Sequence, residues 1–223
     1  MITPELIGTA QVPEGVELRL MRRGDEFTIV LERNELMSTR VWASEEALAE
    51  MTCERIAGRS APDLLIGGYG MGFTLRAALA KLGKDASVTV AELVPEIIEW
   101  ARGPMRDLTA NGLDDPRVLL VEDDVAMLIG AANNGYDAIL LDVDNGPDGL
   151  TRPSNDQIYS AQGLGAAMTA LKPAGILAIW SAQTDPVFTK RLREAGFDVD
   201  EVTVRQRANG KGARHVIWFA QKA

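Results

Sequence analysis

The chain has 223 residues, of which 46% are hydrophobic and 25% are charged, a composition that fits one globular domain and excludes wholesale disorder. Its 32 acidic residues outnumber the 23 basic ones, and the formal charge of -9 disfavours nucleic acid as a partner. One cysteine and one histidine exclude an intrachain disulfide, a cysteine-based zinc cluster and a multi-histidine metal site. Without a signal-peptide pattern or an apolar run of roughly 20 residues, we expect a soluble cytoplasmic protein that does not contact membranes.

The first 62 residues predict a small β-hairpin region followed by a helix. Residues 1–15 show no periodicity and are expected to lie extended over the surface. Residues 16–23 and 26–33 alternate apolar and polar side chains around Gly24-Asp25, which is typical of a hairpin, and residues 36–42 are expected to add a third short strand. A helix is expected over residues 44–58, with Ser44 as its N-cap.

After Pro62 the pattern changes, because short apolar runs alternate with helical segments. Strands are predicted at 63–67, 87–93, 117–122, 137–143 and 175–182, and helices at 72–83, 94–105, 125–135, 155–172 and 186–197. Residues 200–207 and 214–221 predict a closing antiparallel hairpin. The fold class is therefore α/β, a doubly wound Rossmann-like domain over residues 63–223 preceded by a small unit over residues 1–62.

A glycine-rich turn follows the first of these apolar strands. The segment LLIGGYGMG, residues 64–72, contains Gly67, Gly68, Gly70 and Gly72 between a strand and a helix. Glycines permit a tight turn and let a ligand approach the backbone, while the helix start offers free N–H groups. A simple strand-to-helix turn is the alternative interpretation.

Acidic residues follow the next two strands. Glu92 lies about twenty residues beyond Gly72, where an acid in nucleotide-binding α/β domains accepts both ribose hydroxyls, and Leu93 beside it is expected to line the same pocket. Asp123 and Asp124 follow the third strand, and either carboxylate can accept a hydrogen bond from an exocyclic amine such as adenine N6. The alternatives are a solvated carboxylate for Glu92 and a helix N-cap for Asp124.

Two more acids end the fourth strand, in the segment YDAILLDVDNGP. Asp142 and Asp144 would point the same way if the strand continued, because side chains alternate along a strand. Such a pair can deprotonate an attacking amine or bind an ammonium group. A turn at Asp-Asn-Gly-Pro is the alternative. His215, in an alternating segment, is expected to be structural.

The order of these motifs resembles the class I S-adenosylmethionine (AdoMet)-dependent transferases, and within them the spermidine/spermine synthase (aminopropyltransferase) branch. LLIGGYGMGFTLRAAL is similar to that branch's strand–GGGDGG–helix segment, and VTVAELVPEIIEWAR is similar to its ribose-binding strand and helix. YDAILLDVDNGP is similar to its YDVIIxDSSDP segment, and LKPAGILAIW to its LKPxGILVxQ strand. The resemblance covers residues 62 to about 220.

The resemblance implies a role for each matching position. It implies AdoMet or decarboxylated AdoMet as co-substrate without a metal, a small amine acceptor, and a homodimer. Asp142 matches the aspartate that activates the amine, and Glu92 matches the ribose-binding acid. Asp144 lies one place before the position of the segment's second acid, and in an aminopropyltransferase it is expected to help hold the ammonium. The chain departs from the family where Gly70 replaces the aspartate of GGGDGG, and where Leu48 and Ala49 replace a Tyr-His pair.

The sequence is therefore compatible with three functions. The first is amine attack on the carbon next to the sulfonium, as in a spermidine synthase. The second is methyl transfer from intact AdoMet to a small molecule, because Gly70 removes a charge that would repel the donor carboxylate. The third is a non-catalytic nucleoside-binding homologue, because a fold alone does not determine activity.

Overall fold

The computed structural model describes residues 3–13, 17–143 and 157–223. Its first part is a four-stranded antiparallel sheet in the order β1-β2-β3-β4. The strands are β1 (Glu5–Gln11), β2 (Glu17–Arg23), β3 (Glu26–Leu31) and β4 (Asn34–Ser38). The hairpin around Gly24-Asp25 and the short strand after it are confirmed, because β2 pairs with β3 and β3 with β4.

Residues 1–15 were expected only to lie extended over the surface, and the structure adds strand β1 within them. It pairs antiparallel with β2, with a register shift between Leu6 and Gly8. Only Ala10 of its seven residues is buried, so the strand has almost no apolar alternation for a sequence pattern to reveal. Its backbone pairing with β2 supplies the order instead.

Helix α1 (Ala43–Arg55) follows, and its start differs from the prediction. The N-cap is Trp42 with no side-chain capping bond, and Ser44 is already inside the helix. Ser44 Oγ instead donates to the Glu45 carboxylate and contacts His215 Nδ1. The Ser44 cap was wrong because that hydroxyl has tertiary partners that compete with the helix N–H groups.

The second part is a seven-stranded sheet in the order β10-β11-β9-β8-β5-β6-β7. Its strands are β5 (Asp63–Gly67), β6 (Ser87–Ala91), β7 (Val118–Val121), β8 (Tyr136–Leu141), β9 (Leu171–Ser181), β10 (Phe197–Arg205) and β11 (Arg214–Lys222). Strands β9, β8, β5, β6 and β7 are parallel neighbours, and β11 runs antiparallel to both β9 and β10. The doubly wound sheet with its closing hairpin is confirmed.

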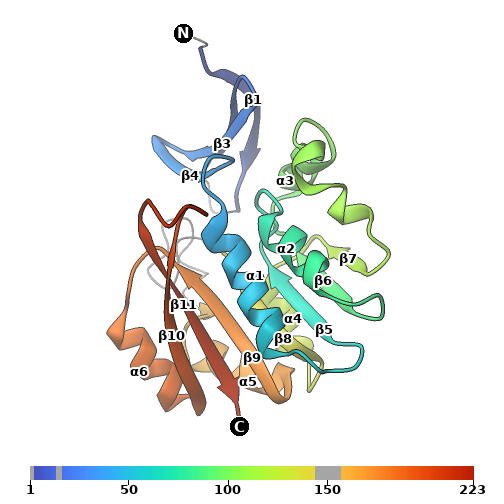
Figure 1. The fold of residues 1–223 in the computed structure, drawn as a ribbon, viewed down its shortest axis with the longest axis vertical. Helices are drawn as coiled ribbons and strands as arrows, with labels where there is room; N and C mark the ends of the chain where they lie inside the picture. The colour runs from blue at the N-terminus through green and yellow to red at the C-terminus, as the bar shows by residue number, and fades with distance from the viewer. Residues whose placement is uncertain (1–2, 14–16, 144–156) are drawn as a thin grey trace.

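Helices cover both faces of this sheet (Figure 1). They are α1, α2 (Phe73–Lys81), α3 (Pro95–Arg102), α4 (Val125–Ala131), α5 (Ala161–Ala170) and α6 (Pro186–Glu194). Alternate strand residues face opposite layers, so Leu64 and Ile66 pack with α1, α2 and α3 while Leu65 packs with α4, α5 and α6. Burial on both faces explains why the strand sequences are apolar throughout.

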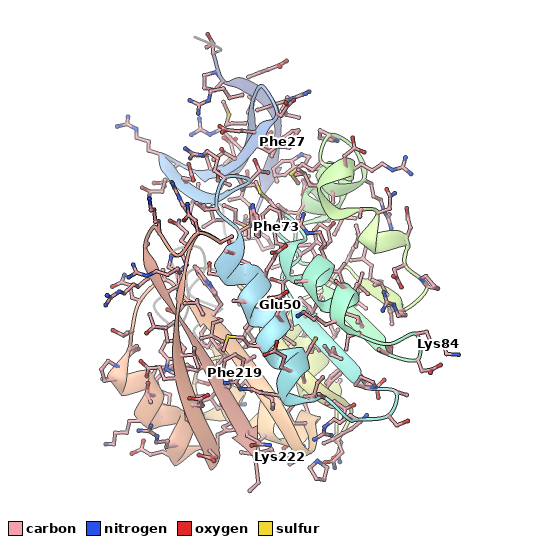
Figure 2. The ribbon with its side chains drawn as sticks, viewed as in Figure 1. Phe27, Glu50, Phe73, Lys84, Phe219 and Lys222 are labelled. Carbon is pink, nitrogen blue, oxygen red and sulfur yellow. The ribbon has the colours of Figure 1, made fainter. Side chains whose placement is uncertain are left out.

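The N-terminal sheet and the larger unit share one apolar core. Phe27 of β3 and Phe73 at the start of α2 belong to the same cluster, and Figure 2 labels Phe27 on the N-terminal sheet and Phe73 below it. This packing holds the small sheet over the glycine turn after β5. Short 3-10 helices at Arg106–Thr109 and Gly112–Asp114, which were not predicted, complete the link from α3 to β7.

Candidate active site

The glycine turn is held against the ends of two neighbouring strands. Gly68 N donates to Ala91 O at 2.9 Å, and Asp142 N donates to Gly67 O at 3.1 Å. Gly68 has φ +84°, and a Cβ there would lie 2.8 Å from Asp142 O, so this position requires glycine. The turn therefore brings backbone close to the residues that follow β6 and β8.

Glu92, directly after β6, is buried and points into the space beside this turn. Its Oε2 accepts from Tyr69 N at 2.8 Å and its Oε1 accepts from Val94 N at 2.9 Å. Burial raises the pKa of Glu92, and the two amides act in the opposite direction. Because each carboxylate oxygen keeps a further lone pair, the oriented group can still accept two hydroxyl hydrogens from a ligand.

The acidic pair after β7 lies on the edge of the same pocket. Asp124 Oδ1 accepts from Ala126 N at 2.9 Å, so Asp124 is the N-cap of α4, as the alternative interpretation stated. Asp123 is exposed and accepts from Asp124 N at 2.7 Å. Both side chains, together with Leu93, line the pocket.

Asp142 lies directly after β8 and faces the pocket from the other side of the turn. Its Oδ2 accepts from the Thr74 hydroxyl at 2.7 Å. Burial raises the pKa of Asp142 to about 6, although the Thr74 hydrogen bond favours the ionised form. Such a carboxylate can accept a proton near neutral pH. Asp144, its predicted neighbour, lies outside the described residues.

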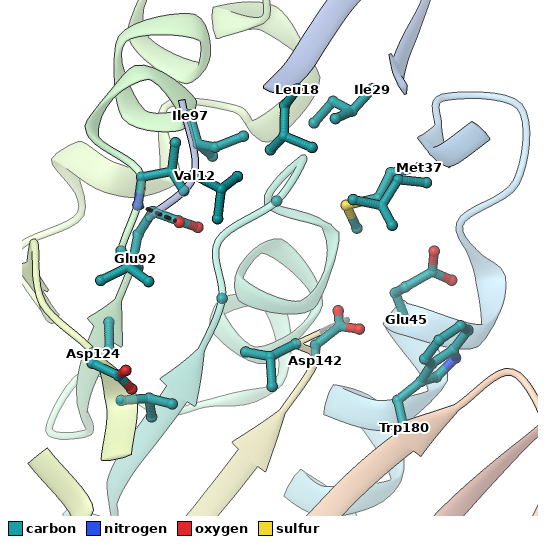
Figure 3. A pocket seen from close by; sticks show the side chains of 18 of the residues that line it. Val12, Leu18, Ile29, Met37, Glu45, Glu92, Ile97, Asp124, Asp142 and Trp180 are labelled. Atoms are coloured by element: carbon teal, nitrogen blue, oxygen red, sulfur yellow. Dashed lines mark hydrogen bonds between the residues drawn. The ribbon is translucent and has the colours of Figure 1, made fainter. Parts of the chain in front are cut away.

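The sequence did not single out Glu45, which lines this pocket from the first turn of α1. Figure 3 shows the carboxylates of Glu45 and Asp142 facing the same space. Burial, followed by the negative charge of Asp142, raises the pKa of Glu45 to about 7. No local pattern could reveal this role, because two acids in a first helical turn also stabilise the helix dipole.

The N-terminal sheet supplies the apolar wall of the pocket, which the sequence also did not predict. The side chains of this wall come from β2, β3, β4 and the residues around them, and they are Val12, Leu18, Ile29, Leu36 and Met37. Trp180 lines the pocket from β9. One end of the pocket is therefore apolar, and carboxylates lie along its floor.

The departures from the family pattern fall at two places in this structure. Gly70 has φ +54°, and a Cβ there would lie 2.6 Å from Met37 Sδ, so a methionine side chain occupies the space that a residue 70 side chain would need. Leu48 and Ala49 are fully buried in the core, which gives them a packing role. At both places an apolar side chain, that of Met37 beside Gly70 and those of Leu48 and Ala49 themselves, lies where the family pattern has a polar residue.

Among the residues that the structure describes, no group of three or more histidine, cysteine, aspartate or glutamate side chains is arranged to hold a metal ion. None of the helices among these described residues combines the length and the apolar character that a membrane-spanning helix requires.

The strand order, the glycine turn and the acids after β6 and β8 place this domain in the class of Rossmann-like AdoMet-methyltransferase folds. Residues 44–194 match the family model described as "Spermine/spermidine synthase domain". The chain therefore belongs to the spermine/spermidine synthase family.

Similar proteins agree with this assignment. A polyamine aminopropyltransferase of Mycobacterium tuberculosis (strain ATCC 25618 / H37Rv) is 32% identical over 192 residues, which cover 82% of this chain and 35% of that protein. The chain thus spans about a third of the length of this curated relative. Putrescine N-methyltransferase 4 of Nicotiana tabacum is 35% identical over 115 residues, or 51% of this chain and 28% of that protein.

A solved spermidine synthase from Thermotoga maritima superposes with a TM-score of 0.76 at 21% identity, covering 98% of this chain and 73% of that one. This likeness includes the N-terminal sheet and confirms the fold.

Proposed function

We propose that this chain transfers an aminopropyl group from decarboxylated AdoMet to a small amine. Membership of the spermine/spermidine synthase family supports the reaction class. The observation that carries the proposal is the position of Glu92 and Asp142, which line one pocket on opposite sides of the glycine turn. A nucleoside held by the first would present its sulfonium substituent to the second.

In this proposal the chain's own groups have separate tasks. Glu92 accepts the ribose hydroxyls, while Asp123 or Asp124 accepts from the adenine amine. Asp142 takes a proton from the acceptor, whose freed lone pair attacks the carbon next to sulfur. The C–S electron pair returns to sulfur, and methylthioadenosine leaves. Because the donor already contains its leaving group, alignment and proton removal account for the protein's contribution.

Methyl transfer from intact AdoMet is the second candidate. Two observations favour it, namely the similarity to a putrescine N-methyltransferase and the absence of a carboxylate at Gly70. A donor carboxylate would experience less repulsion there than beside an aspartate. The two candidates predict different by-products, methylthioadenosine for aminopropyl transfer and S-adenosylhomocysteine for methyl transfer.

The test is calorimetry with AdoMet, decarboxylated AdoMet and methylthioadenosine, followed by product analysis with a panel of mono- and diamines. We expect tighter binding of decarboxylated AdoMet than of AdoMet, and formation of methylthioadenosine. Preference for AdoMet with release of S-adenosylhomocysteine would replace the first proposal by the second. Binding without either product would leave the non-catalytic homologue as the conclusion.

Glu92→Gln tests the nucleoside site separately from the chemistry. A glutamine side chain has only one acceptor oxygen, whereas the Glu92 carboxylate has two. The NH2 group of the glutamine would face the N–H of Tyr69 or of Val94, and two donors cannot form a hydrogen bond with each other. We expect methylthioadenosine to bind at least about 10-fold more weakly, because a hydrogen bond to a charged group contributes about 1.5–3 kcal/mol. Glu122→Gln, at an exposed position after the neighbouring strand, is the matched control and should bind normally.

The proposal includes the homodimer and the cytoplasmic location that the family resemblance implies. Light scattering on the purified chain tests the dimer, and a monomeric mass would remove it from the proposal.

A further inference from the structure

Three buried or half-buried groups outside the predicted site form a chain that ends in the pocket. The hydroxyl of Ser44 donates to Glu45 Oε2 at 2.5 Å, and the Ser44 Oγ atom also lies 2.9 Å from His215 Nδ1. Ser44 is fully buried and His215 is 8% exposed, so water does not compete freely for these contacts. The rings of Trp180 and His215 pack edge to face with their centroids 4.7 Å apart, and this contact restricts the orientation of the imidazole.

We propose that Glu45 is a second acid–base group of this site, and that Ser44 and His215 set its protonation state. This inference rests on the proposed transfer to an amine and assigns three residues to its proton transfer. Glu45 is the catalytic member because it lines the pocket, whereas Ser44 and His215 act through it as positioning residues.

The hydrogen bonds determine which state each group occupies. A hydroxyl has one proton, so Ser44 can donate to ionised Glu45 only if it accepts from His215, which requires the proton on Nδ1. Once Glu45 is protonated it can donate to Ser44, whose own proton then turns to Nδ1. The imidazole proton must in that case lie on Nε2. Glu45, Ser44 and His215 therefore form a proton relay with two complementary states, which differ by one proton on Glu45.

The charges around Glu45 favour a change of state near neutral pH. Asp142 after β8 is a neighbouring negative charge, and Glu46 on α1 is another. Arg76 on α2 pairs with Glu46 at 2.5 Å and offsets that charge. Burial lowers the pKa of His215, which favours the neutral form of its imidazole. Asp142 is thus the charge to which the protonation of Glu45 responds most directly.

The reaction supplies the proton that such a relay needs. An amine enters as R–NH3+, and its N–H bond must break before the lone pair can form the new N–C bond. The C–S bond breaks as the N–C bond forms, with its electron pair going to sulfur, so one proton remains in the site for every group transferred. Asp142 and Glu45 together can hold that proton and the charge of the ammonium group, whereas one carboxylate would have to do both.

The single histidine of the chain allows a direct test that needs no turnover. In nitrogen-15 NMR of the tag-free protein, every imidazole signal belongs to His215. We expect a protonated Nδ1 at pH 8.5 and a protonated Nε2 below the midpoint of Glu45, near pH 7. The change should disappear in Glu45→Gln and persist in Glu46→Gln, a matched control on the same helical turn. An unchanged tautomer between pH 5.5 and 8.5, or the same change in Glu45→Gln, would overturn the proposal.

The kinetic arm uses the pH dependence of kcat/KM with the best acceptor of the panel. Ser44→Ala removes a hydrogen bond that favours ionised Glu45, so the pKa of Glu45 rises. The acidic limb of the pH profile of kcat/KM should therefore move to higher pH. Glu45→Gln should lower kcat at least about 10-fold, since acid–base groups contribute about 10²–10⁴-fold and Asp142 remains. Ser44→Thr, which keeps the hydroxyl, should restore the wild-type limb.

The two arms separate the failure of this inference from that of the proposed function. If the His215 tautomer changes with pH but no group transfer is detected, the proton relay is supported and the proposed transferase activity is rejected. Transfer that proceeds with a pH-independent tautomer would retain the transferase and reject the relay.

Discussion

At the residue scale, the site depends on a glycine whose backbone no other residue adopts easily. Gly68 combines φ +84° with a Cβ position 2.8 Å from Asp142 O, whereas Gly58 has φ +92° and nothing within 4 Å. An alanine at either position would experience the same kind of backbone strain, but only an alanine at position 68 would also clash with a neighbouring backbone atom.

We expect Gly68→Ala to lower the free energy of unfolding by about 2–4 kcal/mol, because strain and a backbone clash add. Gly58→Ala should cost only about 1–2 kcal/mol from strain alone. Urea denaturation of both variants measures the difference. Equal losses would show that the contact with Asp142 O is relaxed at no cost.

Asp142 illustrates the conflict between a reactive group and stability. Its pKa rises from 3.8 to about 6 on folding, so the ionised carboxylate destabilises the folded state at pH above this value. Asp142→Asn keeps an acceptor for Thr74 and removes the charge. We expect the free energy of unfolding of this variant to exceed that of the wild type by about 1–3 kcal/mol at pH 8, since each pKa unit corresponds to 1.36 kcal/mol. This difference should decline as the pH falls from 6 towards 4. Denaturation at pH 8 and 4.5 tests this, and a gain independent of pH would contradict it.

At the element scale, one buried carboxylate joins three segments at the opposite end of the parallel strands. Asp137 of β8 accepts from Arg59 at 2.6 Å, from Lys172 at 2.7 Å and from Asp63 N at 2.8 Å. Asp137 is 4% exposed. These contacts hold the segment before β5 and the start of β9 against β8.

Asp137→Asn should lower the free energy of unfolding by about 2–4 kcal/mol, because it leaves two cations without their shared buried partner. Methylthioadenosine affinity should not change, since the site lies at the other ends of these strands. Asp63→Asn, where the side chain is 44% exposed, is the control and should cost below about 1 kcal/mol. Similar losses in both variants would show that the burial of Asp137 is unimportant.

At the scale of the whole molecule, the pocket belongs to both sheets. Its floor comes from the carboxyl ends of β5, β6 and β8, and Leu18, Ile29 and Met37 cover it from the N-terminal sheet. A bound nucleoside should therefore stabilise the small sheet as well as the large one.

Hydrogen exchange with and without methylthioadenosine tests this expectation. We expect added protection in β2 and β3 together with residues 67–72, because local opening of either part would expose the ligand. The outer strand β10, which supplies no residue to the pocket, serves as the internal control. Protection confined to the large sheet would mean that the N-terminal sheet does not close on the ligand.

Much of the fold could be predicted from local pattern. The parallel strands are continuous apolar runs and the helices have regular spacing, so β5 was predicted at its observed bounds, 63–67. Strand β1 was missed because one buried residue, Ala10, produces no periodicity. The predicted division between residues 62 and 63 stays a prediction, and α1 from the first unit packs on α2 and β9 of the second.

The sequence by itself determined the glycine turn and the acids Glu92, Asp123, Asp124 and Asp142, because parallel strands place their carboxyl ends at one edge of a sheet. Only the tertiary structure brought Glu45, Ser44 and His215 together, since Ser44 and His215 are 171 positions apart along the chain. It also decided that Met37 occupies the space beside Gly70. Local spacing encodes which residues share a strand end, whereas contacts between distant elements depend on how their apolar faces pack.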